Sequence, residues 1–190
     1  MKYYPALLDL QSKKCCVVGG GAIALRKTRS LLSAGAVVTV IAPLLSKHMK
    51  ALADKGAISW RRQPYCKGHL RGAFLVIAAT SDPLVNRSVS KDASKLRILA
   101  NIVDRPALSN FIVPAVLSSK DLIIAVSTSG KAPALCKRIK EDLRVPMREK
   151  YSRALARIAR ERAKLMKGSA GLGARKAILT RMAERELHRS

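Results

Sequence analysis

The sequence predicts an α/β fold: a Rossmann-type parallel sheet, followed by a small dimerisation segment and a helical C-terminal domain. Three observations support this prediction. Short apolar runs alternate with helix-length segments in the first half of the chain, a pattern typical of consecutive βαβ units. A glycine-rich turn separates the first apolar run from the first helix-length segment. The end of the chain is basic and rich in helix-forming residues.

Five strands and three helices are expected in the first domain. The strands cover residues 15–18, 37–41, 58–61, 74–78 and 98–101. The helices cover residues 22–34, 45–55 and 83–95. Gly35 is placed where a glycine commonly ends a helix, and Asp82 followed by Pro83 is typical of a helix start. Strands joined by helices of this length imply right-handed crossovers and parallel pairing.

The chain changes character after Arg105. Two apolar runs, residues 111–116 and 122–126, could extend the sheet or form a small dimerisation unit. A turn-rich loop then leads to a helix over residues 133–143. From Pro146 onward the chain is helical and basic, with 13 Lys and Arg against 4 acidic residues.

Glycines at residues 168–173 divide this basic tail into two helices. The predicted organisation is therefore a dinucleotide-binding domain over residues 1–105, a dimerisation segment over residues 106–145 and a basic helical domain over residues 146–190.

The charge of the chain restricts its partners. Its 190 residues include 37 Lys and Arg against 12 Asp and Glu, a formal net charge of +25. A surface this basic attracts polyanions: nucleic acid, an anionic membrane, or a small molecule with many carboxylates or phosphates. Hydrophobic residues make up 48%, which excludes a disordered polycation, and aromatics only 4%, which disfavours a base-stacking nucleic-acid surface.

Targeting signals and metal ligands are not expected. No stretch approaches the ~18 uncharged apolar residues of a membrane-spanning helix, and the first ten residues lack the apolar core of a signal peptide. Four cysteines and three widely separated histidines show no metal-ligand spacing. The sequence therefore indicates a cytoplasmic protein with reduced thiols, no membrane partner and no metal site.

The glycine-rich turn carries the clearest chemical signal. Gly19, Gly20, Gly21, Ala22 and Ile23 lie within a G-x-G-x-x-A pattern that ends at Ala24. In this pattern the first glycine allows a tight turn, the second lets a pyrophosphate approach the backbone, and the small last residue lets helix and strand pack closely. The helix N-terminus offers free N–H groups to the phosphates. The turn therefore predicts a bound dinucleotide.

The end of the second strand leaves the choice of dinucleotide open. NAD-binding domains commonly carry an acidic residue there for the adenosine ribose. This chain has Pro43 and Leu44 near that point, with no acidic residue and no arginine for an NADP phosphate. Backbone groups of Pro43 and Leu44 are expected to line the adenosine side.

Two polar residues follow the later strands. Ligands of such sheets bind beyond the carboxyl ends of the strands, so Thr80 and Asp104 are candidates for the site. Thr80 either contacts the nicotinamide ribose or only shapes the turn before the next helix. Asp104 either accepts a proton as a hydride leaves the substrate or forms a local turn before Arg105 and Pro106.

At this point the motifs, taken in order, resemble those of the precorrin-2 dehydrogenase and sirohydrochlorin ferrochelatase family, which includes the N-terminal module of siroheme synthase. The resemblance covers about residues 4–144. The matching motifs are Y-P-A-L-L-D-L from Tyr4, C-V-V-G-G-G-A-I-A-L-R-K from Cys16, A-A-T-S-D-P-L-V-N from Ala78, N-I-V-D from Asn101, F-I-V-P-A from Phe111 and A-V-S-T-S-G-K-A-P-A-L from Ala125.

The resemblance implies an NAD-dependent enzyme of sirohaem biosynthesis that oxidises precorrin-2 to sirohydrochlorin. It implies a homodimer, NAD contacts at Ala22, Ile23, Pro43 and Leu44, and a catalytic role for Asp104. The substrate is then a tetrapyrrole with eight carboxylates, for which Arg105 and Lys131 are candidate ligands.

Two alternatives stay open. Some members of the family also insert Fe²⁺ into sirohydrochlorin, so a bifunctional enzyme is the first alternative. The second is a non-enzymatic Rossmann module that binds NAD and acidic partners, which would draw on the same glycine turn and on the basic tail. An octacarboxylate substrate gives part of the charge of +25 a local use, which favours a small anionic ligand over nucleic acid.

Overall fold

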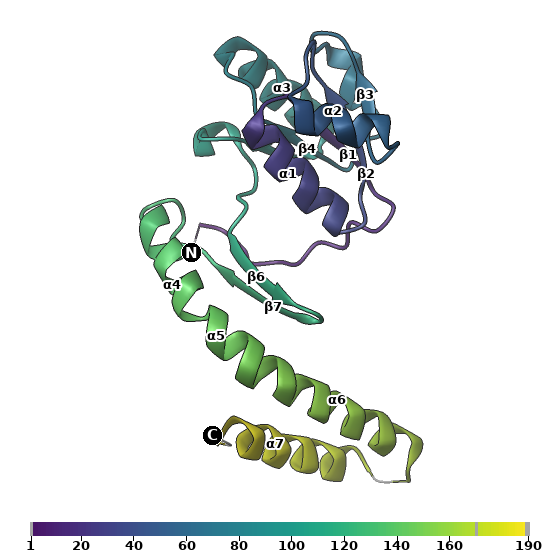
Figure 1. The fold of residues 1–190 in the computed structure, drawn as a ribbon, viewed down its shortest axis with the longest axis vertical. Coiled ribbons are helices and arrows are strands. Elements are labelled where there is room, and N and C mark those ends of the chain that lie inside the picture. The colour runs from purple at the N-terminus through teal and green to yellow at the C-terminus, as the bar shows by residue number, and fades with distance from the viewer. Residues whose placement is uncertain (1, 170, 189–190) are drawn as a thin grey trace. The chain divides into compact units, whose positions relative to one another are not determined.

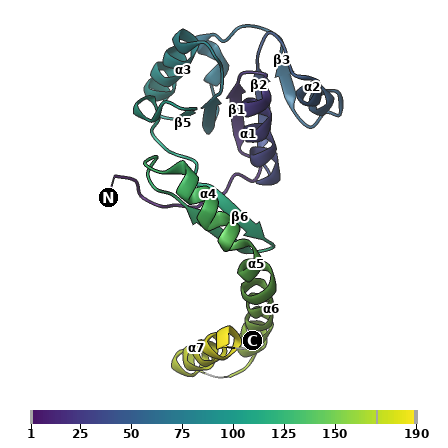
Figure 2. The same cartoon turned by 60° about the vertical axis from the view of Figure 1, so that its left-hand side comes forward.

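A computed structural model describes residues 2–169 and 171–188 (Figures 1 and 2). The contacts divide the chain into two compact units, one ending at Val113 and the other beginning at Pro114. Residues 1, 170, 189 and 190 lie outside the described residues. They include the start of the predicted first domain, the end of the predicted third domain and part of the predicted glycine-rich break. The predicted division into three domains stays a prediction.

The first unit is built on a five-stranded parallel sheet with the strand order β3-β2-β1-β4-β5. Its strands are β1 Lys14–Val18, β2 Val37–Ile41, β3 Ser59–Arg61, β4 Leu75–Ala78 and β5 Leu99–Ile102. In the register, Val18 pairs with Ile41 on one side and with Ala78 on the other. The predicted parallel sheet is confirmed.

Helices cover both faces of this sheet, as Figures 1 and 2 show. They are α1 Ala22–Ser33, α2 Lys47–Asp54 and α3 Pro83–Leu96. Successive strand residues point to opposite faces: Val17 belongs to the cluster that includes residues of α1 and α2, whereas Val18 belongs to the cluster that includes residues of α3. Both faces of β1 are therefore buried, which explains its uninterrupted apolar sequence.

The helix ends follow the local signals of the sequence. The Asp82 carboxylate accepts hydrogen bonds from the backbone N–H groups of Leu84 (2.8 Å) and Val85 (3.2 Å), and so caps α3. Gly35 follows α1 with a φ of 77°, in the left-handed region that suits glycine. Two short 3₁₀ turns, Lys67–Leu70 and Pro106–Leu108, complete the first unit.

The second unit contains a β-hairpin and a series of helices. Strands β6 Ala115–Ser119 and β7 Leu122–Val126 pair antiparallel as a separate two-stranded sheet. The two predicted runs therefore do not extend the main sheet: the end of the first run and the second run pair with each other. The alternative, a dimerisation unit, stays a prediction. The helices are α4 Pro133–Asp142, α5 Arg144–Pro146, a π-helical turn Met147–Tyr151, α6 Ser152–Lys167 and α7 Leu172–His188.

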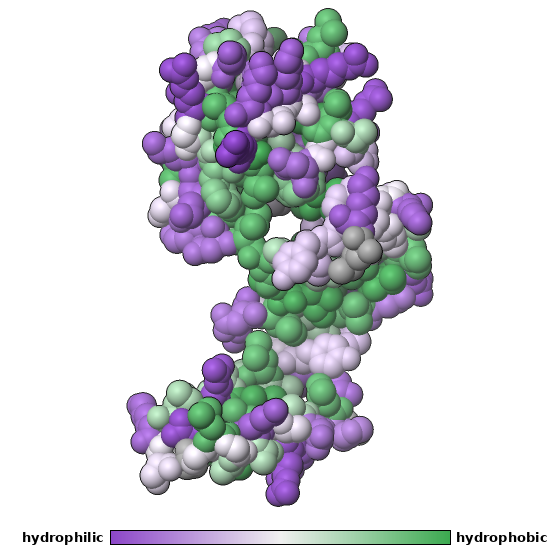
Figure 3. Space-filling view, turned by 180° about the vertical axis from the view of Figure 1, so that it is seen from behind, coloured by the Kyte–Doolittle hydropathy of each residue, from purple (hydrophilic) through white to green (hydrophobic). Residues whose placement is uncertain are grey.

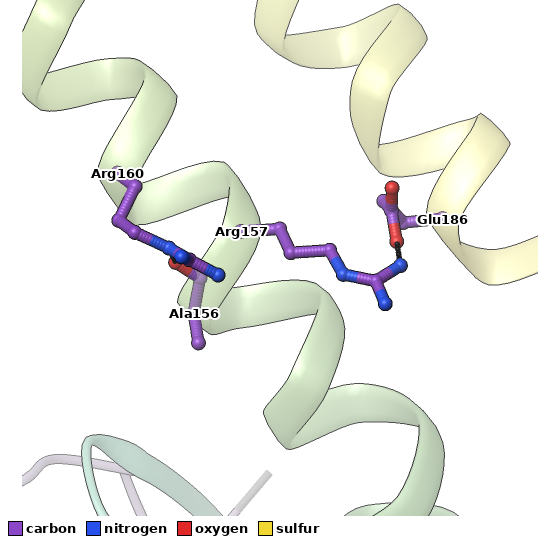
Figure 4. Close-up of polar contacts among 4 residues, drawn as sticks. All are labelled: Ala156, Arg157, Arg160 and Glu186. Atoms are coloured by element: carbon purple, nitrogen blue, oxygen red, sulfur yellow. Dashed lines mark hydrogen bonds and ion pairs between the residues drawn. The ribbon is translucent and has the colours of Figure 1, made fainter.

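A small apolar core holds the second unit together. The hairpin contacts α4, and the buried residues include Leu117 of β6, Cys136 of α4 and Met147. Helices α6 and α7 lie side by side, and Arg157 Nη1 donates to Glu186 Oε2 across 2.6 Å between them (Figure 4). None of the helices in the described part of the chain is long and apolar enough to cross a membrane.

Candidate functional site

A cavity of about 880 Å³ lies at the carboxyl ends of the parallel strands in the first unit. It lies at the ends of the neighbouring strands β1 and β4, from which the chain continues toward opposite edges of the sheet. This is the topological switch point at which ligands of such sheets bind. Its lining includes every residue predicted to bind the cofactor, together with Asp104. The predicted cofactor residues are Gly19, Gly20, Gly21, Ala22, Ile23, Pro43, Leu44 and Thr80.

The three glycines of the turn have three different surroundings. Gly19 has a φ of 121°, and a side chain there would overlap the carbonyl of Ala79 at the end of β4. A side chain at Gly20 would overlap the carbonyl oxygen of Leu44, which lies on the loop after β2. A side chain at Gly21 would meet no atom within 4 Å. The first two glycines therefore allow loops to pack, and the third leaves space open at the cavity.

The N-terminus of α1 supplies the anion-binding groups of this cavity. Gly21 is its N-cap and contributes no side-chain hydrogen bond, and the first turn holds no acidic residue. The first N–H groups of a helix lack partners within the helix and carry positive potential. The described lining contains no Lys or Arg, and its charged side chains are Asp82 and Asp104. A bound anion would therefore be held by backbone N–H groups.

The wall near β2 is apolar and held in place by a tryptophan. Trp60 of β3 donates its indole N–H to the carbonyl oxygen of Ala42 over 2.9 Å. The next residues, Pro43 and Leu44, are exposed at the cavity. Pro64 and Tyr65 complete this wall, and the sequence prediction did not include them.

Tyr65 is fixed from outside the cavity. Its hydroxyl donates to Asp92 Oδ2 of α3 over 2.9 Å, and burial and this bond raise the pKa of Tyr65. Tyr65 is far along the sequence from the glycine turn and from the other predicted site residues, so no motif spacing indicated it. Only the tertiary fold brings the loop after β3 to the cavity.

Thr80 lies in the lining and also orders the turn before α3. Its Oγ1 lies 3.0 Å from both the carbonyl oxygen of Asp82 and Asn86 Oδ1, and it accepts from the backbone N–H of Asp82 over 3.2 Å. The cap of α3 itself is Asp82. The predicted contact of Thr80 with a ribose stays a prediction.

Asp104 follows β5 and lines the cavity with an exposed carboxylate. Its φ of 58° lies in the left-handed region, which Asp tolerates better than most residues. The carboxylate makes no hydrogen bond to the described residues, so no local Asx turn occupies it. Asn101 of the same predicted segment is not in the lining; its amide donates to the carbonyl oxygen of Phe111 over 3.1 Å.

Lys27 of α1 is an additional charged neighbour that the sequence prediction did not include. It is half-buried, and burial lowers the pKa of its ammonium group, as does the nearby Arg26. The negative charge of Asp104 acts in the opposite direction. This coupling places Lys27 within electrostatic reach of Asp104.

The two predicted substrate ligands lie outside the large cavity. Arg105 lines a neighbouring cavity of about 440 Å³, which shares Asp104 with the first. Lys131 lies in the second unit, in the turn before α4, where its backbone N–H donates to Thr128 over 3.0 Å. Both substrate roles stay predictions. No group of three His, Cys, Asp or Glu side chains suited to a metal ion occurs among residues 2–169 and 171–188.

A dinucleotide fits the residues that are present. The cavity volume lies within the range of small-molecule and cofactor sites. Gly21 leaves the backbone approachable, and the uncapped start of α1 faces the cavity. The strand order, the switch-point cavity and the glycine turn together define a dinucleotide-binding protein of the Rossmann class.

Comparisons with known proteins agree with this class. A family of domains described as "Putative NAD(P)-binding" matches residues 6–115. Siroheme synthase 1 of Aeromonas salmonicida is 37% identical over 182 residues, which cover 96% of this chain and 39% of that protein. Siroheme synthase of Photobacterium profundum is 38% identical over 176 residues, covering 93% of this chain and 38% of that protein.

A solved structure is similar over almost its whole length. SirC, a precorrin-2 dehydrogenase, has a TM-score of 0.80 and 31% sequence identity, and the match covers 95% of this chain and 89% of SirC. The chain belongs to the NAD(P)-binding family that precorrin-2 dehydrogenase and the siroheme synthases share. It spans about two fifths of the length of the siroheme synthases that it matches.

Proposed function

We propose that this protein oxidises precorrin-2 to sirohydrochlorin in sirohaem biosynthesis, with NAD as the hydride acceptor. The observation that carries the proposal is the meeting of the glycine turn, the uncapped start of α1 and the exposed Asp104 in one cavity. The similarity to SirC over 89% of its length supports the choice of substrate.

The chain's residues give each part of NAD a place. Backbone N–H groups at Ala22 and Ile23 bind the pyrophosphate, because Gly21 leaves that side of the turn open. Pro43 and Leu44 lie against the adenosine. Thr80 and Asp104 flank the nicotinamide, whose chemistry is to accept a hydride from a carbon of the substrate.

Asp104 takes the proton that accompanies the hydride. The oxidation removes two electrons and two hydrogens from precorrin-2: one hydrogen leaves as hydride and the other as a proton. The Asp104 carboxylate is exposed and without a hydrogen bond among the described residues, so it can accept this proton and release it to solvent. Lys27 adds a cationic group within electrostatic reach of this carboxylate. Holding the two reactants beside each other supplies much of the rate.

Anaerobic incubation with precorrin-2 and NAD tests the proposal. We expect NADH to form with the native protein, and Asp104→Asn to lower kcat by about 10²-fold or more while NAD affinity is kept. The matched control is Asp54→Asn, which removes an exposed carboxylate at the end of α2. Absence of NADH formation with the native protein, with an active SirC sample alongside, would contradict the proposed reaction.

A second candidate function is insertion of Fe²⁺ into sirohydrochlorin. It is favoured by the exposed carboxylate of Asp104, which could accept the protons that leave the macrocycle as the metal enters. Adding Fe²⁺ after the first reaction tests it, because sirohaem has a distinct absorbance spectrum. Conversion of sirohydrochlorin to sirohaem no faster than in the protein-free reaction would contradict this second function.

A further inference from the structure

We infer that Arg87 and Arg105 form a carboxylate-binding site in the smaller cavity, which holds the acidic side chains of the substrate while its reacting carbon faces Asp104. This inference rests on the proposed function for the identity of the substrate. It assigns to Arg87 a role that no motif of the sequence indicated, and it gives Arg105 a partner.

The smaller cavity has the composition that an anionic ligand requires. Its volume is about 440 Å³, and its lining residues include Arg87, from α3, and Arg105, from the turn after β5. Neither guanidinium group makes a hydrogen bond or an ion pair with any residue that the structure describes. Two unpaired guanidinium groups at one cavity favour the binding of carboxylates, because each guanidinium can donate two parallel hydrogen bonds to one carboxylate.

The two cavities differ in charge, which separates their ligands. The described lining of the larger cavity contains two carboxylates and no Lys or Arg, so an anion with many carboxylates meets no cationic side chain in that lining. The smaller cavity contains two cations and one carboxylate. A tetrapyrrole with carboxylates around its rim would therefore place part of that rim in the smaller cavity, while backbone N–H groups hold the pyrophosphate in the larger one.

Asp104 connects the two cavities. Among the described residues it is the one that lines both. A macrocycle with acidic side chains between Arg87 and Arg105 would present its adjacent carbons to the Asp104 carboxylate, on the border of the cofactor cavity. The arginines thus act as positioning residues, and Asp104 remains the group that touches the reacting proton.

The walls that carry the arginines are fixed to each other. Ser90 lies one turn beyond Arg87 in α3, and its hydroxyl donates to the carbonyl oxygen of Leu108 over 2.6 Å. Ser109 Oγ accepts from the backbone N–H of Ile102 over 2.9 Å and lies 3.1 Å from the carbonyl oxygen of Arg105. These contacts tie the turn after β5 to both α3 and β5, so the spacing of the two arginines is set by the fold.

The test compares Arg87→Gln with Arg105→Gln, alone and together, in the full chain. We expect the double variant to raise KM for precorrin-2 about tenfold or more, since each lost charge-assisted contact weakens binding severalfold. kcat should change much less, and the affinity for NAD should stay unchanged. The double Arg→Lys variant should recover part of the affinity, because it keeps the charges without the planar forks. Lys95→Gln, an exposed residue farther along α3, is the matched control.

A binding measurement separates this inference from the proposed reaction. Uroporphyrin, an octacarboxylic porphyrin, serves as the probe, and quenching of its fluorescence reports binding. Loss of uroporphyrin binding in the double variant but not in Lys95→Gln supports the carboxylate site even if the native protein forms no NADH. Equal binding by the native protein and the double variant, including no binding by either, overturns the inference. A parallel loss of NAD affinity in the double variant also overturns it, since the arginines would then belong to the cofactor site.

Discussion

Gly20 and Gly21 are neighbours that lack a side chain for different physical reasons. Gly20 packs against the carbonyl of Leu44, whereas nothing lies within 4 Å of the position a side chain would take at Gly21. The sequence pattern predicted a dinucleotide turn but assigned no packing role to Gly20. The contact with Leu44 arises only when the loop after β2 reaches the turn, which local sequence does not specify.

We therefore expect alanine to affect mainly stability at Gly20 and mainly NAD binding at Gly21. Gly20→Ala should lower the free energy of unfolding by about 1–3 kcal/mol, because backbone atoms must move to admit the methyl group. Gly21→Ala should cost about 1 kcal/mol or less but weaken NAD binding, because its methyl group enters the space left for the phosphates. Urea unfolding and NAD titration measure the two effects. Equal losses of stability in both variants would contradict this distinction.

His69 gives the first unit a predictable response to pH. It is buried, and burial, followed by the charge of Arg61, lowers the pKa of its imidazole below the ordinary value of 6.5. Its Nδ1 accepts from the backbone N–H of Cys66 over 3.0 Å. Below about pH 6.5 the unfolded chain takes up a proton that the folded protein resists, so the free energy of unfolding falls as the pH falls.

Urea unfolding between pH 7.5 and about pH 5.5 measures this slope, in a range above the titration of ordinary carboxylates. His69→Gln should flatten the slope, whereas His48→Gln, at an exposed position of α2, should leave it as in the native protein. A slope unchanged by His69→Gln would show that another group is responsible.

At the scale of elements, the sequence was most informative where one segment decides its own structure. Residues 15–18 of β1 and all of β4 are uninterrupted apolar runs, and Gly35 and Asp82 mark helix boundaries locally. The run over residues 111–116 was less informative, because it is divided between two units. Phe111 packs against the core of the first unit, whereas β6 begins at Ala115 in the second.

The candidate site likewise contains residues that the sequence predicted and residues that it did not. Residues within the glycine turn and at strand ends were predictable, since a parallel sheet brings its carboxyl ends together. Lys27, Tyr65 and Arg87 come from a helix interior or from an irregular loop, and only packing brings them near Asp104 or the cavities. No periodicity or spacing separates such residues from ordinary exposed ones.

The ion pair between α6 and α7 is expected to stabilise the packing of these two helices. Glu186 has a side chain only 9% exposed, and it accepts from Arg157 over 2.6 Å (Figure 4). Glu186→Gln should destabilise the packing of α7 by about 1 kcal/mol, since Arg157 is half-exposed and solvent screens part of the interaction. Faster hydrogen exchange in α7 measures the effect. Glu184→Gln, an exposed change in the same helix, is the control, and equal exchange in both variants would contradict the prediction.

At the scale of the whole molecule, the hairpin of the second unit indicates a partner. Val116 and Ile123 are 40% and 47% exposed, on the face of the hairpin opposite to Leu117 and Ile124. Figure 3 shows hydrophobic surface gathered over this part of the second unit. A two-stranded sheet needs further packing to be stable. The hairpin already contacts α4, and a second copy of the chain on its exposed face would stabilise it further.

We therefore expect a homodimer in solution. Light scattering should give twice the chain mass of 20.6 kDa, and Ile123→Glu should yield the monomer, because the interface would bury an unpaired charge. Leu172→Glu, which adds the same charge to an exposed apolar residue of α7, should leave the dimer intact. A native protein of monomer mass would contradict the expectation.

The lining of the larger cavity contains no cationic side chain, whereas the smaller cavity has two arginines. The binding of the two proposed ligands, NAD and precorrin-2, should therefore depend differently on ionic strength. Dissolved salt screens exposed charges over about 10 Å at 0.1 M, but it weakens hydrogen bonds from fixed backbone N–H groups far less. If the proposed sites hold precorrin-2 and NAD, a cell that accumulates ions would weaken the binding of precorrin-2 more than the binding of NAD. The net charge of +25 would extend that sensitivity beyond the cavities, because a basic surface attracts a polyanion before any contact forms.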